Sequence, residues 1–497
     1  MTTTSADDVG VAENEQLAQR LAERDWRLLR SGHLVSAEDG GMFGVSSPYS
    51  EESIAEVPDA TRTDVAETVE AAHAAASSWG RESAVRRSEL VLQLADAIEE
   101  RRHDFAVLDS YDGGAPIGIM QKDVAAALES LRYFAGLARE LKGYTVPAST
   151  NLHFTELQPF GVVAKIIAFN HPFMFAASKI AAPLIAGNTV VLKPSETTPL
   201  SALLLGEIAN ELLPAGVLNV VVGNGPAVPD ALVRHPKVRR IGFTGSEAVG
   251  RAIQRSAAEV AVKNITLELG GKNALIAFPD SDPADVARAA VAGMNFTWSG
   301  QSCGSTSRLL LHEAIADEVL NEVTKLLDGR HYVNPLDPKA IQGTMVSRRQ
   351  YERVLTYIDG AVDQGAQVVT GGGRPASTDR GLFIEPTFLE VGSDWPVANE
   401  EIFGPVVSVI RWSDPDEAVR IANSVDYGLT GSVFTNDIKV AHQTARALET
   451  GFVWINDAGP HYLGLPYGGW KSSGVGREES LDELLSYAQS KSVSVTL

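Results

Sequence analysis

Residues 161–193 read GVVAKIIAFNHPFMFAASKIAAPLIAGNTVVLK, and they predict a strand, a helix and a second strand in succession. The runs GVVAKIIAF and TVVLK are continuous in apolar and β-branched residues, as expected for strands that are covered on both faces. The helical part between them contains Lys179, Pro183 and the pair Gly187 and Asn188, so it is a poor candidate for a membrane span. The stretch therefore predicts a parallel βαβ unit.

The same alternation of short apolar runs and helix-length segments continues from here to the C-terminal part of the chain. We expect further strands in the runs LNVVV, RRIGF, NITLEL, NALIAF, RLLLH, AQVVT, VVSVI, GSVFT and GFVWIN. Two helices are expected earlier, because apolar residues recur there at helical spacing; they are Val65, Val69 and Ala72, and Leu90, Leu94, Ala97 and Ile98. The fold class predicted is α/β, with two Rossmann-like parallel-sheet domains that meet near residues 268–273. Such folds bind ligands at the carboxyl ends of their strands.

Composition excludes several classes of protein. The chain has 497 residues, of which 44% are hydrophobic and 21% charged, as in a soluble globular protein of more than one domain. Its net charge of −21 argues against nucleic acid or an anionic membrane as a partner. A single cysteine cannot form an internal disulfide, and the polar, acidic N-terminus does not resemble a signal peptide. We therefore expect a cytoplasmic protein.

The single cysteine, Cys303, lies in the stretch GQSCGSTSR at residues 300–308. A free cysteine is commonly a small buried hydrophobic residue. Here, however, its glycine and serine neighbours suit close approach of a ligand to the backbone. A thiol at its ordinary pKa is only slightly ionised at neutral pH, so a nucleophilic Cys303 would need a base or a cationic neighbour.

Two polar residues at predicted strand ends could supply the remaining chemistry. Glu268 ends an apolar strand directly before two glycines, where a buried carboxylate is costly unless it is paired. It would be either a structural residue with a partner or a base with a raised pKa that faces a cleft. Asn170 follows the strand GVVAKII, and its amide could donate to an oxyanion together with the backbone N–H of a nucleophile. With Cys303, these residues suit attack on a carbonyl followed by base catalysis.

Two other strand ends suit a nucleotide cofactor. The stretch TGSEAVG at 244–250 lies between a strand and a helix start, where free N–H groups can bind phosphate, although an ordinary glycine turn would look the same. It does not have the G-x-G-x-x-G spacing. In LKPSETTP at 192–199, Lys193 and Glu196 could bind a ribose, which would favour NAD over its 2′-phosphorylated form. They could also be a solvated charge pair.

Taken together, seven motifs show that the chain resembles the aldehyde dehydrogenase superfamily over nearly its full length. They occur in the order and at the spacing of that family: AFNHPF, AGNTVVLKPSETTP, IGFTGSEAVG, LELGGKN, GQSCGSTSR, EEIFGP and LPYGGWKSSGVGRE. The resemblance implies NAD(P)-dependent oxidation of an aldehyde to a carboxylic acid by the hydrolytic, non-acylating route.

The resemblance also implies a role for each matched position. Cys303 would form a thiohemiacetal and then a thioester, Asn170 would hold the oxyanion, and Glu268 would activate the hydrolytic water. Lys179 matches a lysine near the active site. Lys193 and Glu196 would contact the adenosine ribose, Gly245 and Ser246 the pyrophosphate, and Glu401 and Phe403 the nicotinamide ribose and ring. The cofactor-binding set is completed by Gly225, Gly250 and Leu269. NAD is the expected cofactor, with NADP as an alternative, and no metal is expected.

The family's architecture implies three parts. Residues 1–136 and 158–268 would form the NAD-binding domain, residues 269–480 the catalytic domain, and residues 137–157 and 481–497 a small β oligomerisation element. A homodimer or homotetramer is therefore expected.

The positions expected around the aldehyde depart from the common pattern of the family. Ser178 replaces a frequent tryptophan, and His171 replaces a bulky aromatic residue after Asn170. The predicted substrate pocket contains His171, Met174, Ser178, Ser302, Gly304, His461, Tyr462 and Tyr467. No arginine is placed to bind a second carboxylate, so the pocket favours an aromatic or medium-length aldehyde over a short semialdehyde acid.

Two other functions remain open at this stage. A CoA-acylating dehydrogenase would release the acyl group to a thiol, but that route needs no base for water, so Glu268 argues against it. A non-catalytic binding protein could keep the same fold. The presence of Cys303, Glu268 and Asn170 together argues against that second alternative.

Overall fold

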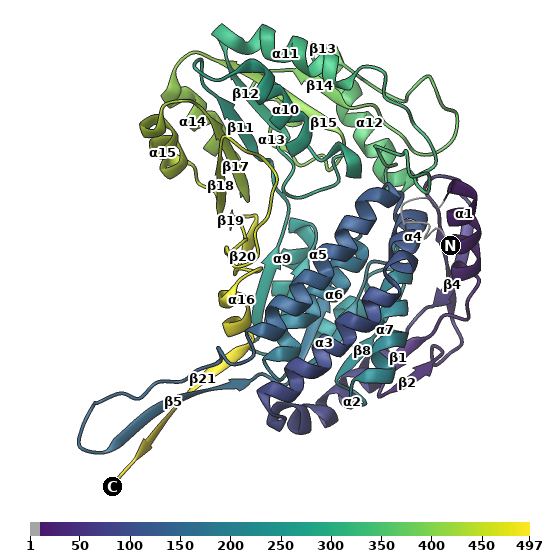
Figure 1. The fold of residues 1–497 in the computed structure, drawn as a ribbon, viewed down its shortest axis with the longest axis vertical. Coiled ribbons are helices and arrows are strands. Elements are labelled where there is room, and N and C mark those ends of the chain that lie inside the picture. Colours follow the sequence, from purple (N-terminus) through teal and green to yellow (C-terminus); the bar gives the residue numbers. More distant parts are fainter. Residues whose placement is uncertain (1–9) are drawn as a thin grey trace, which may run out of the picture.

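The computed structural model describes residues 10–497 and folds them into two α/β lobes and a projecting two-stranded arm (Figure 1). The larger lobe is built on an eight-stranded sheet with the strand order β2-β1-β8-β7-β6-β9-β10-β20. Its five central strands are parallel: β6 (Val162–Ile166), β7 (Thr189–Lys193), β8 (Leu218–Val220), β9 (Val238–Thr244) and β10 (Asn264–Glu268). Every residue of β6 and β7 is buried, and apart from Lys165 and Lys193 their residues are apolar or β-branched.

The predicted βαβ unit is confirmed, because α6 (Pro172–Ile185) connects β6 to β7. Both faces of the sheet carry helices, and the two predicted early helices lie among them. The helices of this lobe are α1 (Val11–Ala22), α2 (Arg62–Arg81), α3 (Ala84–Glu100), α4 (Arg102–Gly113), α5 (Ile117–Gly136), α7 (Leu200–Leu212), α8 (Ala227–Arg234) and α9 (Glu247–Ala258). Antiparallel strands β1 (Leu28–Arg30) and β2 (His33–Val35) extend one edge, and β3 (Met42–Ser46) pairs with β4 (Ser53–Pro58).

The second lobe has a seven-stranded sheet in the order β13-β14-β15-β12-β11-β17-β18. Only β13 runs antiparallel to its neighbour. Its strands are β11 (Ala274–Ala277), β12 (Arg308–His312), β13 (Gln367–Thr370), β14 (Thr387–Glu390), β15 (Val406–Trp412), β17 (Thr430–Phe434) and β18 (Phe452–Ile455). Its helices are α10 (Pro283–Gly293), α11 (Glu313–Leu327), α12 (Arg348–Asp363), α13 (Pro396–Asn399), α14 (Pro415–Asn423) and α15 (Ile438–Ala447), with the short 3₁₀ helix η1 (Phe296–Trp298).

The chain passes from the first sheet to the second directly after β10 and later returns beside it. After the small β16 (Tyr427–Gly428) and β19 (Trp470–Lys471) pair, β20 (Gly474–Val475) runs antiparallel to β10 and places Gly474 opposite Glu268. Helix α16 (Leu481–Ser486) then packs on α6. This return brings the C-terminal segment against the end of β10.

The arm consists of β5 (Leu152–Pro159) and β21 (Ala488–Val495), which pair antiparallel and project from the larger lobe (Figure 1). Residues 481–487 lie outside the arm, since Leu484 and Tyr487 are buried in the core of the larger lobe. The division of the chain into parts with separate functions stays a prediction. Within residues 10–497, none of the helices combines the length and the apolar character that crossing a bilayer requires.

Candidate active site

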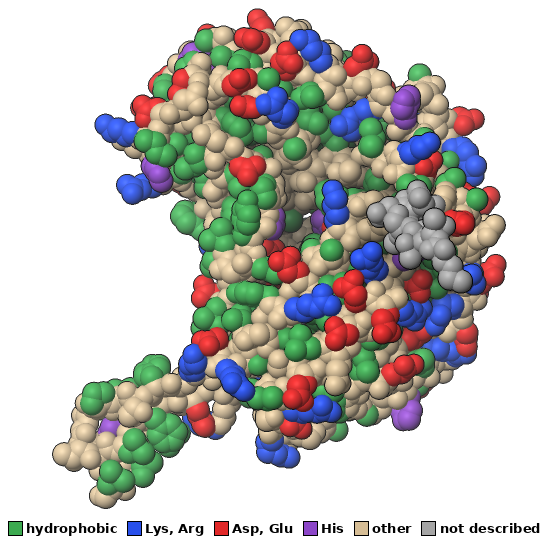
Figure 2. Space-filling model, in the orientation of Figure 1, with side chains coloured by type: hydrophobic (Ala, Val, Ile, Leu, Met, Phe, Trp, Pro, Cys, Tyr) green, Lys and Arg blue, Asp and Glu red, His purple; other side chains and the backbone are tan. Residues whose placement is uncertain are grey.

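A cleft of about 890 Å³ lies where the two lobes meet, and Figure 2 shows a hollow between the lobes with histidine side chains in view. Its lining brings together most of the residues predicted for catalysis and cofactor binding: Asn170, Lys193, Glu196, Gly225, Gly245, Ser246, Glu268, Leu269, Cys303, Glu401 and Phe403. Gly250 lies behind the lining. A Cβ atom at Gly250 would come within 2.8 Å of the Leu269 side chain, so the glycine allows α9 to pack on the strand end.

Cys303 lies on the loop between η1 and β12. The loop begins with residues in the left-handed region, among them Gly300 at φ +67°, where a Cβ atom would come within 2.4 Å of the Gly404 carbonyl. It is then held by the Asn273 amide, which donates to the carbonyls of Cys303 (2.7 Å) and Ser305 (2.9 Å). The position of the cysteine is thus determined by backbone contacts, and the residue as a whole is partly buried.

The environment of Cys303 keeps the thiol protonated in this state. Desolvation raises the pKa of Cys303 to about 12, and the negative charges of Glu268 and Glu401 act in the same direction. Lys179 and the hydroxyl of Tyr467 act in the opposite direction. A reactive thiolate therefore requires a base or an additional positive charge in the cleft.

Glu268 occupies the end of β10 and is 6% exposed, yet neither of its carboxylate oxygens has a hydrogen-bond partner. Burial raises its pKa well above the ordinary value, and the nearby charge of Glu478 adds to the effect. The carboxyl group is close to the backbone of Gly468, where a Cβ atom would lie 3.1 Å from Oε1. A buried, unpaired carboxyl group beside a thiol has the properties of a general base.

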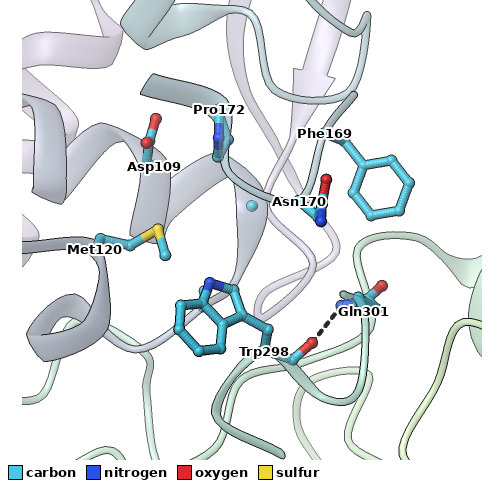
Figure 3. Close-up of a pocket in the computed structure, with 9 residues that line it drawn as sticks. Asp109, Met120, Phe169, Asn170, Pro172, Trp298 and Gln301 are labelled. Carbon is cyan, nitrogen blue, oxygen red and sulfur yellow. Dashed lines mark hydrogen bonds between the residues drawn. The ribbon is translucent and has the colours of Figure 1, made fainter. Parts of the chain in front are cut away.

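Asn170 follows β6 and is 8% exposed, and its amide makes no hydrogen bond with the described residues. It lines both the large cleft and a small cavity that it shares with Asp109, Met120 and Trp298 (Figure 3). Asp109 accepts a hydrogen bond from the backbone N–H of Phe173 (2.8 Å), which caps the first turn of α6 directly after Asn170. The amide is thus held on a fixed backbone with its donor available.

Lys179 contacts Glu478, a carboxylate that the sequence analysis did not identify as part of the site. It forms an ion pair with Glu478, and the amine of Lys165 lies 3.6 Å from the other oxygen of the same carboxylate. Burial alone would raise the pKa of Glu478, but Lys179 and Lys165 hold it below its ordinary value. Glu478 ends the motif LPYGGWKSSGVGRE, but nothing local in the sequence indicates a partner 299 residues away.

The cofactor side of the cleft offers a carboxylate, an amine and an uncapped helix N-terminus. Lys193 Nζ lies 3.3 Å from Glu196 Oε2, and burial lowers the pKa of Lys193. Ser246 is the N-cap of the 12-residue helix α9, and its side chain caps no N–H group. The first N–H groups of α9 are therefore free for a phosphate. This donor set fits the ribose and pyrophosphate of a dinucleotide.

Glu401 and Phe403 lie at the other end of the cleft. The Glu401 carboxylate accepts a hydrogen bond from the backbone N–H of Gly271 (3.0 Å), and burial raises its pKa. Phe403 adopts φ +56°. Ser302, which was predicted for the substrate pocket, lines a small cavity with Glu401 and Phe403.

The residues predicted around the aldehyde lie in different environments. His171 pairs with Asp123, and its ring centroid is 5.1 Å from that of Trp298. His461 pairs with Glu479 at 3.1 Å and packs on Tyr467. Tyr467 and Gly304 are buried, Met174 and Ser178 are partly buried, and Tyr462 is 56% exposed.

Aromatic residues complete the surroundings of the thiol, and of these the sequence analysis identified Tyr467 but missed Phe452, Trp454 and Trp298. Phe452, Trp454 and Tyr467 form a buried cluster against which Cys303 packs. Trp298 was detectable only through its position five residues before Cys303.

The chain is similar to known proteins over nearly its full length. A model of the aldehyde dehydrogenase family matches residues 34–493. The chain is 45% identical over 464 residues to aldehyde dehydrogenase tropH of Talaromyces stipitatus, covering 91% of this chain and 89% of the relative. Its fold is similar to that of an NAD⁺ complex of an aldehyde dehydrogenase from Bacillus cereus (36% identity, TM-score 0.93, covering 96% and 98% of the two chains). It is also similar to indole-3-acetaldehyde dehydrogenase AldA of P. syringae (34% identity, TM-score 0.94, covering 98% and 100%).

Proposed function

The chain belongs to the aldehyde dehydrogenase family, and from this premise we propose that Cys303, Glu268 and Asn170 carry out its reaction. The protein is an oxidoreductase that converts an aldehyde to the carboxylic acid with a nicotinamide cofactor. One observation carries the proposal for the residues: a buried carboxyl group without a partner lines the same cleft as the only thiol of the chain.

In the first half of the reaction, the Cys303 thiol gives up its proton to water or a base in the cleft, and the thiolate attacks the carbonyl carbon to form a thiohemiacetal. The negative charge that develops on the aldehyde oxygen accepts hydrogen bonds from the Asn170 amide and from the backbone N–H of Cys303. NAD, when bound in the cleft, supplies the acceptor for the hydride that leaves the carbon. Cys303 then holds the acyl group as a thioester.

In the second half, Glu268 takes a proton from a water molecule as that water attacks the thioester carbon. The C–S bond breaks, the carboxylic acid leaves, and the Cys303 thiolate is regenerated. The raised pKa of Glu268 makes it basic enough for this step once it has lost its proton. The same carboxylate could also take the thiol proton earlier, but we assign it chiefly to hydrolysis, because the positive charge of an oxidised nicotinamide favours the thiolate by itself.

For the cofactor, we assign Lys193 and Glu196 to the adenosine ribose, and the start of α9 at Gly245 and Ser246 to the pyrophosphate. Glu401 and Phe403 are assigned to the nicotinamide end. The carboxylate of Glu196 accepts from a free 2′-hydroxyl but repels a 2′-phosphate, so NAD is the preferred cofactor. Gly225, Gly250 and Leu269 shape this part of the cleft.

The substrate is an aromatic or medium-length aldehyde. Support comes from the cluster of Phe452, Trp454 and Tyr467, against which Cys303 packs, and from Trp298, which lines a small cavity with Asn170. The similar protein AldA of P. syringae is named for indole-3-acetaldehyde, which is an aromatic aldehyde.

We further propose that the protein forms homodimers or homotetramers in the cytoplasm. Within residues 10–497, the outer edge of β21 has no strand partner, and β18 is likewise an edge strand of its sheet. Exposed apolar residues lie near the return of the chain, with Leu465 at 49%, Trp470 at 47% and Val475 at 51% exposure. Unpaired edges and apolar patches are commonly covered in assemblies. Light scattering on the full chain, compared with a chain truncated before Ala488, tests the assembly.

Absorbance of NADH at 340 nm with a panel of aldehydes, with and without CoA, tests the activity. The proposal expects NADH and free acid without CoA. A strict requirement for CoA would indicate the acylating alternative, and no NADH with any aldehyde would indicate a non-catalytic protein.

A further inference from the structure

His171 and Asp123 form a pair that the proposed reaction does not use. His171 is the N-cap residue of α6 and directly follows Asn170, whereas Asp123 lies on α5. The imidazole Nδ1 is 2.7 Å from Asp123 Oδ2, and the two side chains are 12% and 7% exposed. An ionised carboxylate only accepts hydrogen bonds, so Nδ1 carries a proton in this pair.

The other ring nitrogen of His171 is available for a ligand. Nε2 makes no hydrogen bond with any of residues 10–497. It retains contact with solvent, because it does not belong to the buried side-chain atoms of these residues that have no partner. In the tautomer whose single proton is on Nδ1, the imidazole presents a lone pair at Nε2. By accepting the Nδ1–H hydrogen bond, Asp123 fixes this tautomer and makes Nε2 a more basic acceptor. The pair therefore presents a hydrogen-bond acceptor to a group that carries a proton.

The surroundings of His171 suit a flat apolar ring. The imidazole is packed between Trp298 and Phe175, with centroid distances of 5.1 Å and 5.2 Å. On the thiol side, Cys303 packs against the cluster of Phe452, Trp454 and Tyr467. Trp298 lines a small cavity with Asn170, and Asn170 lines the cleft with Cys303, so an aldehyde at Cys303 gains contact area if it carries an aromatic ring.

His461, the second imidazole near the thiol, is less suited to select a substrate. Its Nδ1 lies 3.1 and 3.2 Å from the two oxygens of Glu479, but its side chain is 39% exposed. A hydrogen bond there competes with bulk water, whereas one at the less exposed His171 replaces fewer water contacts.

From these observations we infer that the Asp123–His171 pair selects aromatic aldehydes that carry a hydroxyl group on the ring. His171 Nε2 accepts a hydrogen bond from that hydroxyl group. The inference rests on the proposed function, since it requires that the aldehyde reacts at Cys303. Asn170 binds the carbonyl group of the aldehyde, and the next residue, His171, binds its hydroxyl group.

Matched substrates test the inference. Phenylacetaldehydes with a hydroxyl group at each ring position in turn are compared with the corresponding methoxy compounds, which lack the donor hydrogen. Their phenols have an ordinary pKa of about 10, so they keep the proton at neutral pH. For at least one ring position, kcat/KM for the hydroxy compound should exceed that for the methoxy compound by about tenfold, the effect of one buried hydrogen bond.

Two variants separate recognition from structure. His171→Phe keeps an aromatic ring beside Trp298 but removes Nε2, so the hydroxy-to-methoxy ratio should fall to about one. Asp123→Asn allows the ring proton to move to Nε2, which turns the acceptor into a donor, so the ratio should fall by a smaller factor. His73→Gln, at an exposed position of α2, is the control and should keep the wild-type ratio.

The outcomes are distinct. Oxidation of these aldehydes with a ratio near one at every ring position would overturn the inference and leave the proposed function intact. An unchanged ratio in His171→Phe would overturn it as well, and if that variant does not fold, an unchanged ratio in Asp123→Asn has the same meaning. No NADH from any aldehyde would contradict the proposed function itself.

Discussion

Two glutamates close to the reacting thiol have the same side chain and nearly the same burial, but opposite electrostatic environments. Glu268 is 6% exposed and Glu478 is 3% exposed. Both oxygens of Glu268 lack a hydrogen-bond partner, whereas Glu478 lies between the amines of Lys179 and Lys165. The pKa of Glu268 is accordingly raised and that of Glu478 is lowered.

The difference shows that partners, and not burial, decide what a buried carboxylate does. The lysines offset the cost of burying the charge of Glu478, and in return that charge keeps them ionised and holds the C-terminal segment on the larger lobe. The carboxyl group of Glu268 is left unpaired, so it remains free to bind a proton. The predictions below test this contrast.

The largest effect is expected from Cys303→Ala, which removes the reacting atom. Aldehyde oxidation should fall below about one per cent of the wild-type rate, because no other group can replace the covalent catalyst. NAD affinity, measured by calorimetry, should change little. Retained turnover would contradict the role of Cys303, and iodoacetamide should label the wild-type chain at this site alone.

Glu268→Gln should lower steady-state turnover by about 10²–10⁴-fold, since a neutral amide cannot take a proton from water. One equivalent of NADH should still form in a burst, and mass spectrometry should detect the acyl group on Cys303. Loss of the burst would instead assign Glu268 to thiol deprotonation. An unchanged steady-state rate would indicate that Glu268 has a structural role and is not a catalytic base.

The same carboxyl group predicts how the rate depends on pH. A base acts only after losing its proton, and burial raises the pKa of Glu268 well above its ordinary value. Hydrolysis of the thioester should therefore be slow in acid and accelerate as the pH rises through that raised pKa. Glu268→Gln should lose this rise, which single-turnover measurements across the pH range would detect.

Glu478→Gln should lower the free energy of unfolding, whereas Glu268→Gln should leave it unchanged. It leaves Lys179 and Lys165 buried without their counter-charge, a change that typically costs about 3–5 kcal/mol of unfolding free energy. Glu268→Gln removes no partner, so its free energy of unfolding should match that of the wild type. Urea unfolding of both variants makes the comparison, and equal stability of the two would refute it.

The smallest effect is expected at Glu196, whose carboxylate is 39% exposed. The wild type should have a higher kcat/KM with NAD than with NADP. Glu196→Gln should shift that ratio toward NADP by a factor of about 2 to 5, as expected for a charge interaction that solvent screens. No relative gain for NADP would remove Glu196 as the cause of the preference.

Much of the fold could be predicted because it depends on local sequence. Strands β6 and β7 are buried on both faces, so their composition alone revealed them. The start of α10 also depends on local sequence, since Asp282 caps the helix and Pro283 is its first residue. The return of the chain through β20 was not predictable, since a strand of two residues carries no periodic pattern.

By itself the sequence determined which groups could react: one thiol, a glutamate at a strand end and an amide at another. It also determined that these ends belong to parallel strands, whose carboxyl ends meet at one edge of a sheet. Only the tertiary structure decided that Glu268 has no partner, that Lys179 meets Glu478 across 299 residues, and that His171 meets Asp123 across 48. The physical reason is that strand and helix formation depend on neighbours along the chain. The charge state of a buried group depends instead on water exclusion and on the groups that folding brings within a few ångströms of it.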